Sequence, residues 1–244
     1  MSKYSSKDMV LLLDGYNILG TSVSLDYLAE ALTEQTTPLG AEWEEHTCVG
    51  IKRAEVKQEG FFDDASDSIN EALNEQQGLD RILCFGFEGN TIGKQFSGFQ
   101  GAMETKYTRI ASRGKMHRAN VEYAGNGIAE DGRILHPLTA RTADGDTEST
   151  PVDNSVQTTD GGAAYLQVTA LTLGGYDNVA ITVRQSADGI AWEDLTSFTV
   201  VATAPNKERK TIAGTIKQYL AVSWAFTGTG SDPSATFFVG VARN

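Results

Sequence analysis

Apolar and polar residues alternate with a period of two through the last third of the chain, and turn residues interrupt the alternation at short intervals. Leu166, Val168 and Ala170 follow this pattern, and Val179 to Val183 repeats it. Such alternation is typical of antiparallel strands with one buried face. A hairpin turn is expected at Ser186–Gly189, because a glycine there can adopt a positive φ. Further strands are predicted at residues 192–201, 209–212, 218–227 and 235–242.

One of these segments also indicates how the strands pack. Within residues 219–226, the large apolar side chains fall on one face and small ones on the other. The large face consists of Leu220, Val222, Trp224 and Phe226. Several short strands of this kind, with no helical periodicity between them, predict a β-sandwich whose core contains Trp224 and Phe226.

The first part of the chain is predicted to be a sheet or small barrel with one helix. The helix is expected over Phe62–Gln76, where Phe62, Ala65, Ile69, Ala72 and Leu73 recur at helical spacing. Asp63, Asp64 and Asp67 would cap its N-terminus. Strands are predicted at residues 10–13, 49–58, 81–87, 104–112, 115–123 and 132–138. The predicted fold class is therefore mainly β with one helix.

A change in composition suggests two domains. Residues 139–162 are rich in Thr, Asp, Gly and Ser, which is typical of a connection. The segment is either unstructured throughout, or Val152 and Val156 begin the next strand. We therefore divide the chain into a first domain at 1–145, a connection at 146–162 and a C-terminal β-sandwich at 163–244.

The formal net charge is −12, and most of the acidic excess lies early in the chain. Residues 1–148 carry 14 Lys and Arg against 24 Asp and Glu. Nucleic-acid binders gain affinity from basic surfaces, so tight DNA binding is disfavoured. No apolar run is long enough for a membrane span, and the run 9–13 is too short for a secretory signal, which predicts assembly in the cytoplasm. Cys48 and Cys84 are expected to pack as small hydrophobic residues and not as a disulfide.

Several segments resemble the major tail, or tail tube, proteins of siphoviruses, which are long-tailed bacteriophages. They are Asp14–Gly20, Ala31–Glu34, Trp43–Thr47, Glu59–Asp64, Arg133–Leu138 and Gly161–Val168. The resemblance implies a tail-tube-like β-sandwich or barrel domain, followed by a C-terminal sandwich that decorates the outside. It also implies hexameric rings that stack into a virion tail tube through which DNA passes without tight binding. Its implied partners are copies of itself and the tape measure, tail terminator and distal tail proteins.

The stretch 33–47 is long, acidic and interrupted by Pro38 and Gly40 between two strand-like segments, which is unusual for a loop without a function. We expect it to dock on a neighbouring subunit, with Leu39 and Trp43 as apolar anchors in a charged rim. The alternative is a mobile surface loop whose Trp43 folds back on its own core. The candidate interface residues are Thr33, Glu34, Pro38, Leu39, Gly40, Glu42, Trp43, Glu44, Glu45 and His46. The acidic excess either lines the lumen or keeps the whole surface soluble.

No pattern in the sequence predicts a catalytic, metal or cofactor site. His46 follows two glutamates but lacks the second histidine of a helical zinc site. The stretch 89–95 has glycines too close together for a phosphate loop, and Gln95 stands where a Ser or Thr belongs. His46, His117 and His136 lie in separate segments; His117 is expected to face solvent and His136 to pack at a strand end. We therefore predict that the protein is not an enzyme.

Two other classes of function stay open at this stage. Acidic, helix-poor, β-rich chains also serve as capsid decoration or head-to-tail connector proteins. A host-surface or carbohydrate-binding tail protein is the second class, because β-sandwiches can present aromatic platforms to sugars. Only Trp192, beside Glu193 and Asp194, is expected to be an exposed aromatic of that kind.

Overall fold

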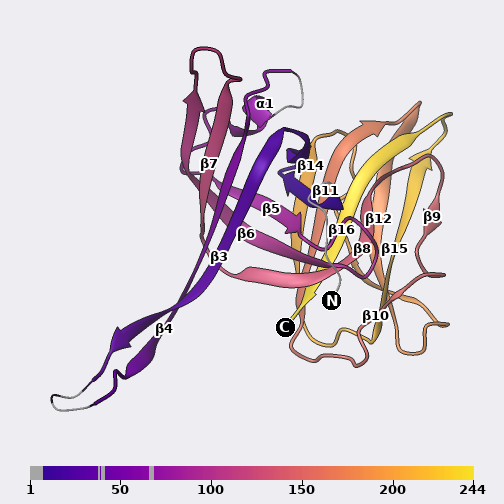
Figure 1. The fold of residues 1–244 in the computed structure, drawn as a ribbon. Coiled ribbons are helices and arrows are strands. Elements are labelled where there is room, and N and C mark those ends of the chain that lie inside the picture. Colours follow the sequence, from indigo (N-terminus) through magenta and orange to yellow (C-terminus); the bar gives the residue numbers. More distant parts are fainter. Residues whose placement is uncertain (1–7, 38, 40–41, 66–68) are drawn as a thin grey trace.

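The fold is mainly β, as the alternation predicts (Figure 1). It is given by a computed structural model that describes residues 8–37, 39, 42–65 and 69–244. Within these residues there is an eleven-stranded sheet and a five-stranded sheet, and every pairing between their strands is antiparallel. No helix in the described part of the chain is long and apolar enough to cross a membrane.

The elements follow one another along the chain in the order β1 (Val10–Leu13), β2 (Tyr16–Asn17), the 3-10 helix η2 (Leu19–Thr21), β3 (Ser22–Gln35), β4 (His46–Phe61), α1 (Ile69–Leu73), β5 (Asp80–Gly86), β6 (Gln95–Ile110), β7 (Arg118–Gly125), β8 (Ala129–Arg141), β9 (Gly145–Asp146), β10 (Val152–Asp153), β11 (Gly162–Thr172), β12 (Tyr176–Ser186), β13 (Glu193–Ser197), β14 (Asn206–Ile212), β15 (Tyr219–Gly228) and β16 (Ser234–Arg243).

A sandwich forms in the C-terminal part, as the sequence indicates. The sheet neighbours β14, β11, β16 and β8 pack against the five-stranded sheet of β10, β15, β12, β13 and β9. Trp224 and Phe226 lie in the core between these sheets, as predicted, with only 6% and 7% of their surface exposed. Leu135 of β8 is buried in the same core, so the first part of the chain supplies one strand of the sandwich.

The connection is partly ordered into strands. β9 and β10 both pair with β15, and Val152 begins the second of them, whereas Val156 is exposed. The Ser186–Gly189 turn forms as expected, with Ser186 Oγ accepting hydrogen bonds from the amides of Asp188 and Gly189.

A second core lies in the first part of the chain, where β1, β5, β6, β7, β4 and β3 surround α1. The helix is much shorter than predicted. Ile69, Ala72 and Leu73 are buried as the pattern requires. Phe62, however, directly follows the end of β4, and its amide donates to the His117 carbonyl at 3.1 Å.

The expected aspartate caps differ accordingly. Asp63 Oδ1 accepts a hydrogen bond from the Ala65 amide at 3.0 Å, in a turn that precedes the helix. Asp64 is exposed, and Asp67 lies outside the described residues.

A third core joins the two parts of the chain. The long sheet curls until β2 contacts β11 and β5 contacts β14. Alternate residues then serve different cores: Leu11 and Leu13 of β1 face the α1 side, whereas Val10 and Leu12 face the interior of the curled sheet. This explains why β1 is apolar at every position, because both of its faces are buried.

Glycines let the large rings of this third core approach the backbone. A Cβ at Gly98 would lie 2.7 Å from the Tyr165 ring, and one at Gly240 would lie 2.4 Å from the Phe96 ring. The interior between them also contains Cys84, Ile134 and Phe238. The division at residues 145 and 163 stays a prediction about folding units, and the two parts share this core and the β8–β16 pairing.

One long strand and the environment of one cysteine differ from what the sequence predicts. β3 was not predicted, because residues 22–35 mix exposed and half-buried side chains without a clean alternation. Cys84 is buried as expected, but Cys48 is exposed, because β4 begins beyond the edge of the core.

Candidate assembly surface

The most prominent surface feature is the hairpin of β3 and β4, which extends well past the core (Figure 1). Near the core, Leu25, Tyr27 and Ala54 pack against the cluster around α1. Farther out, nearly all described side chains of the hairpin are exposed, from Ala29 through Arg53. We call residues 29–53 the arm. A two-stranded ribbon exposed on both faces gains little stability by itself, so its length needs another explanation.

The arm extends the two strands farther than the sequence suggested. Thr33, Glu34 and Gln35 belong to β3 and lie opposite Cys48, Thr47 and His46 of β4. The predicted loop at 33–47 therefore shrinks to residues 36–45, which we call the arm tip.

Backbone and hydroxyl contacts hold the base of the arm tip. The Thr36 amide donates to the Glu45 carbonyl at 2.8 Å, and the Glu45 amide donates to Thr37 Oγ1 at 2.9 Å. His46 Nε2 lies 3.6 Å from a carboxylate oxygen of Glu44. These contacts close the hairpin, and the large side chains of the tip that the structure describes stay exposed.

Two large apolar side chains project from the arm tip. Leu39 is fully exposed and Trp43 is 82% exposed, so in the isolated chain Trp43 does not fold back on its own core. Glu42, Glu44 and Glu45 around them are exposed as well. Pro38 and Gly40, the other two predicted interface residues, lie outside the described residues. The docking role of the tip remains a prediction.

The outer edge of β3 is the second notable surface. Among the described strands, β3 pairs only with β4, so the opposite edge of a 14-residue strand has no partner there. Val23, Leu28 and Leu32 are exposed along the same strand. Unpaired strand edges with apolar side chains readily pair with another chain, and stable monomers usually protect them.

The outward face of the sheet bears charges of alternating sign. Asp26 of β3 lies opposite Lys57 of β4, which lies opposite Glu122 of β7. Glu122 in turn is 3.1 Å from Lys106 Nζ of β6. This row is nearly neutral, so the acidic excess of the chain is not concentrated there. That the acidic excess lines a lumen stays a prediction.

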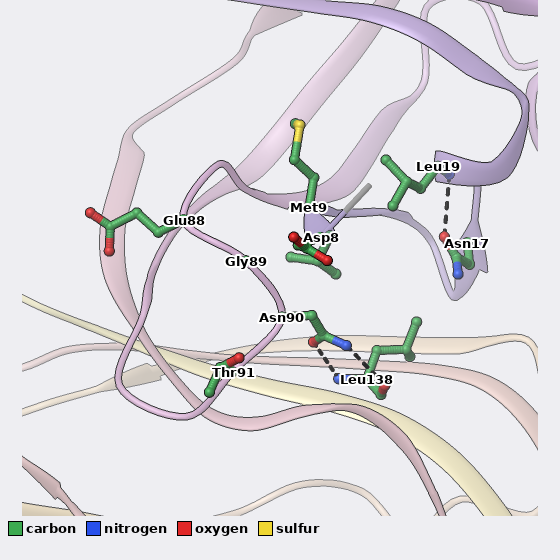
Figure 2. Close-up of a pocket in the computed structure, with 10 residues that line it drawn as sticks. Asp8, Met9, Asn17, Leu19, Glu88, Gly89, Asn90, Thr91 and Leu138 are labelled. Carbon is green, nitrogen blue, oxygen red and sulfur yellow. Dashed lines mark hydrogen bonds between the residues drawn. The ribbon is translucent and has the colours of Figure 1, made fainter. Parts of the chain in front are cut away.

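An open cavity lies where the loop after β5 approaches Asp8 and Met9 (Figure 2). Its volume is about 560 Å³. Asn90 holds this loop to the end of β8: its side chain donates to the Leu138 carbonyl at 3.0 Å and accepts from the Leu138 amide at 2.7 Å. Asp8 and Glu88 also line the cavity. Two carboxylates and a backbone-bound amide therefore line this cavity.

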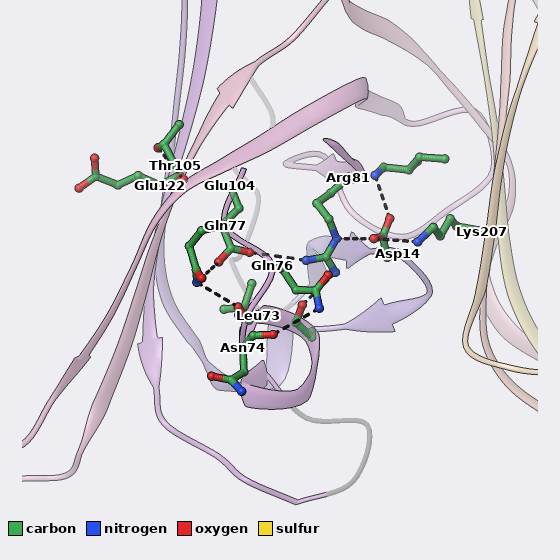
Figure 3. Close-up of polar contacts among 12 residues, drawn as sticks. Asp14, Leu73, Asn74, Gln76, Gln77, Arg81, Glu104, Thr105, Glu122 and Lys207 are labelled. Carbon is green, nitrogen blue, oxygen red and sulfur yellow. Dashed lines mark hydrogen bonds and ion pairs between the residues drawn. The ribbon is translucent and has the colours of Figure 1, made fainter. Parts of the chain in front are cut away.

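A cluster of charges is buried between the two parts of the chain (Figure 3). Arg81 Nε donates to Asp14 Oδ2, and Arg81 Nη2 donates to the Ala72 carbonyl at 2.8 Å. Glu104, on the next strand, accepts from Gln77 Nε2 at 3.0 Å. Burial raises the pKa of Glu104 to about 7, and the nearby Arg81 guanidinium only partly offsets this. The cluster fixes elements that are far apart in the sequence to one another.

The histidines do not come together. His117 is exposed, as predicted, and His136 is fully buried in β8, where its ring stacks on Phe237 with centroids 4.1 Å apart. In the described part of the chain, no group of three His, Cys, Asp or Glu side chains is arranged to hold a metal ion. Trp192, the predicted exposed aromatic, is partly buried.

No protein-family model matches the chain, and no curated protein sequence matches it. Among solved structures, a chain of the virion of a native gene transfer agent particle is 16% identical with a TM-score of 0.40. A chain of the tail of an empty particle of this kind, with C6 symmetry, is 14% identical with a TM-score of 0.41. Each match covers 52% of this chain and 97% of the other.

The Dit protein (gp 19.1) of phage SPP1, described as a hub adsorption apparatus, matches over a greater length. It covers 96% of this chain and 98% of its own, at 12% identity and a TM-score of 0.33. Because these identities and scores are low, the proposal for this chain's function rests on its own geometry.

Proposed function

We propose that this chain is a structural subunit of a virion tail that assembles with copies of itself into stacked rings, forming the tail tube of a long-tailed phage. The observation that carries the proposal is the surface left incomplete in the single chain. The 14-residue strand β3 has an unpaired outer edge within the described sheet, and it leads into an exposed arm whose tip presents Leu39 and Trp43.

Pairing across the β3 edge would satisfy backbone groups that otherwise depend on water. It would also cover Val23, Leu28 and Leu32, which are partly exposed in the single chain. Identical subunits that join through two different surfaces form closed rings when the rotation between them closes. The ring would be hexameric by the resemblance of residues 14–20, 43–47 and 59–64 to siphovirus tail tube proteins.

The tube would serve as a conduit for DNA. A lumen lined by the outward face of β3, β4, β7 and β6 would present the alternating row of Asp26, Lys57, Glu122 and Lys106. A face whose charges neutralise one another displaces few counterions from DNA, so it would let the duplex slide without gripping it. The tape measure protein would occupy the same channel before DNA enters.

Sedimentation velocity of the purified protein over a range of concentrations tests the proposal. We expect large species to replace the monomer as the concentration rises. Leu28→Lys and Leu32→Lys together should hold the protein at the monomer, because charges on an edge strand oppose pairing with another chain. The matched control carries Ile190→Lys and Val200→Lys, which place the same two charges on exposed apolar residues outside β3. A wild-type protein that remains a monomer at every concentration would contradict the proposal.

A further inference from the structure

A basic turn lies at the end of the sheet opposite the arm tip. β4 begins at the arm tip and ends at Phe61, where it lies opposite Arg118 of β7. The turn between β6 and β7 projects there (Figure 1). Residues 109–118, which we call the basic turn, include Arg109, Arg113, Lys115, His117 and Arg118 but no Asp or Glu.

Apolar side chains are exposed among these charges. Met116 is 71% exposed, and Ile110 and Phe61 are each exposed by more than a third. A shallow cavity of about 130 Å³ opens beside them, lined by Phe62, Arg109, Ile110, Ala111, His117 and Arg118. It has room for one aliphatic side chain or for the edge of an indole ring.

Two of the carboxylates near the basic turn, Glu59 and Asp63, have partners of their own, whereas Asp64 is exposed. Glu59 lies 3.7 Å from Arg118, whose guanidinium also lies over the Phe61 ring. Asp63 accepts a hydrogen bond from the Ala65 amide within its own turn. Arg113 and Lys115 are exposed, and residues 109–118 contain no carboxylate, so the turn itself presents positive charge.

The arm tip has the complementary character. Glu42, Glu44 and Glu45 surround Leu39 and Trp43, and all five side chains are exposed. One surface is thus an acidic projection with two apolar side chains, and the other is a basic surface with an apolar cavity. Opposite charges around a small apolar contact are typical of specific protein interfaces.

The two surfaces of one chain cannot meet each other. The 16 residues of β4 separate them, which at about 3.3 Å per residue amounts to roughly 50 Å. A contact between the tip of one copy and the basic turn of another leaves a free tip and a free turn at the ends. Such a head-to-tail contact repeats without limit when the rotation does not close.

We propose that the arm tip of one subunit docks on the basic turn of a subunit in the next ring, with Trp43 or Leu39 in the cavity beside Ile110 and Phe62. This inference rests on the proposed self-assembly and names the surface that receives the arm. The contact gives the stack its direction, because one ring face presents acidic tips and the other presents basic turns.

Charge reversal on each side tests the contact. The tip variant carries Glu42→Lys and Glu44→Lys, and the turn variant carries Arg113→Glu and Lys115→Glu. Either variant alone should raise the concentration needed for stacking by at least about tenfold, because like charges then face each other across the contact. The chain with all four substitutions should stack at close to the wild-type concentration. Glu42→Asp with Glu44→Asp, and Arg113→Lys with Lys115→Arg, keep the charges and should stack as the wild type does.

Sedimentation and negative-stain microscopy distinguish the outcomes, and circular dichroism melts confirm that each variant folds. If both reversed variants stack like the wild type, or if the fourfold variant stays as defective as either one, the docking contact is wrong while self-assembly stands. If the wild type itself forms no assemblies, the proposed function fails, and this inference fails with it.

Discussion

Lys207 Nζ lies 2.8 Å from Asp14 Oδ2, so a residue of β14 completes a buried charge cluster that begins just after β1 (Figure 3). Asp14 thereby lies between two cations, Arg81 and Lys207, and its other oxygen accepts from the Ile82 amide at 2.9 Å. The Asp14 backbone has a φ of 52°, a conformation that asparagine also tolerates. The cluster joins parts of the chain that are almost 200 residues apart. Its contribution to the free energy of unfolding can be tested by substitutions that do not change the shape of the backbone.

Asp14→Asn should destabilise the monomer by about 3 kcal/mol, because it removes the nearest counter-charge of the buried Arg81 guanidinium and leaves it with Glu104 at 3.5 Å. Lys207→Met should cost less than about 1 kcal/mol, because the lysine is 43% exposed and water screens its ion pair. Urea denaturation of both variants measures the difference. Equal losses in the free energy of unfolding for the two variants would show that the burial of Arg81 does not determine how much the cluster stabilises the fold.

Glu104 should make the protein less stable as the pH rises from about 4.5 to about 7. Its pKa is raised from 4.5 to about 7 in the folded chain, so the folded state holds a proton that the unfolded state releases. Glu104→Gln should remove this contribution, which is on the order of 3 kcal/mol above pH 7. Denaturation midpoints at pH 5, 6, 7 and 8 test this: the variant should gain on the wild type as the pH rises, and parallel curves would contradict it.

His136 should make the protein less stable as the pH falls from about 6.5 to about 3, which is the opposite pH dependence to that of Glu104. Arg141 Nε donates to His136 Nε2 at 2.8 Å, so the Nδ1–H donates to the Phe237 carbonyl. Burial and the Arg141 charge lower the pKa of His136 to about 3, and stability present above pH 6.5 is lost as the pH falls toward 3. NMR of the imidazole should show a neutral ring at pH 5, with the exposed His117 as the reference resonance. A His136 ring that titrates near pH 6 would contradict this account.

Substitutions of Trp43 and Trp224 should have different effects, the first on assembly and the second on folding. Trp43→Ala should change the free energy of unfolding of the monomer by less than about 0.5 kcal/mol, because the side chain is 82% exposed, yet it should weaken assembly. Trp224→Ala, at a residue only 6% exposed, should cost about 3 to 5 kcal/mol. Chemical denaturation and sedimentation of both variants measure the two effects. A large loss of monomer stability in Trp43→Ala would mean that the tip packs on its own chain.

The C-terminal sandwich should need β8. A fragment of residues 151–244 lacks the strand that pairs with β16, and it lacks Leu135 and His136, which pack in the same region. A fragment of residues 129–244 should therefore be more stable by at least about 2 kcal/mol. Thermal melts of the two fragments test this expectation. Equal stability would favour a folding boundary near residue 151.

The sequence predicted the strands well wherever burial is one-sided. The alternation in residues 219–226 placed Trp224 and Phe226 in the core, and the structure confirms both. No pattern in the sequence predicts β3, because no core packs against its outer residues. Phe62 has helical spacing, but its amide bonds to the turn between β6 and β7 instead. The pairing of β16 with β8 leaves no local signal in the sequence, because the two strands are far apart along the chain.

For the candidate site, the sequence identified the acidic arm but not the surface that would receive it. Length, charge and the position of Trp43 were enough to single out residues 33–47. The basic turn carries a visible signal as well, with five basic or histidine residues among residues 109–118. Its role as a receiving surface can be proposed only from the fold, because the strands place it at the far end of β4 from the arm tip.

Negative-stain electron microscopy of the purified chain at high concentration tests the central claim most directly. We expect rings that stack into hollow tubes of uniform width, and we expect a chain lacking residues 39–43 to give folded subunits without tubes. Single, well-folded particles of monomer size in the wild-type sample, at every concentration tried, would contradict the account.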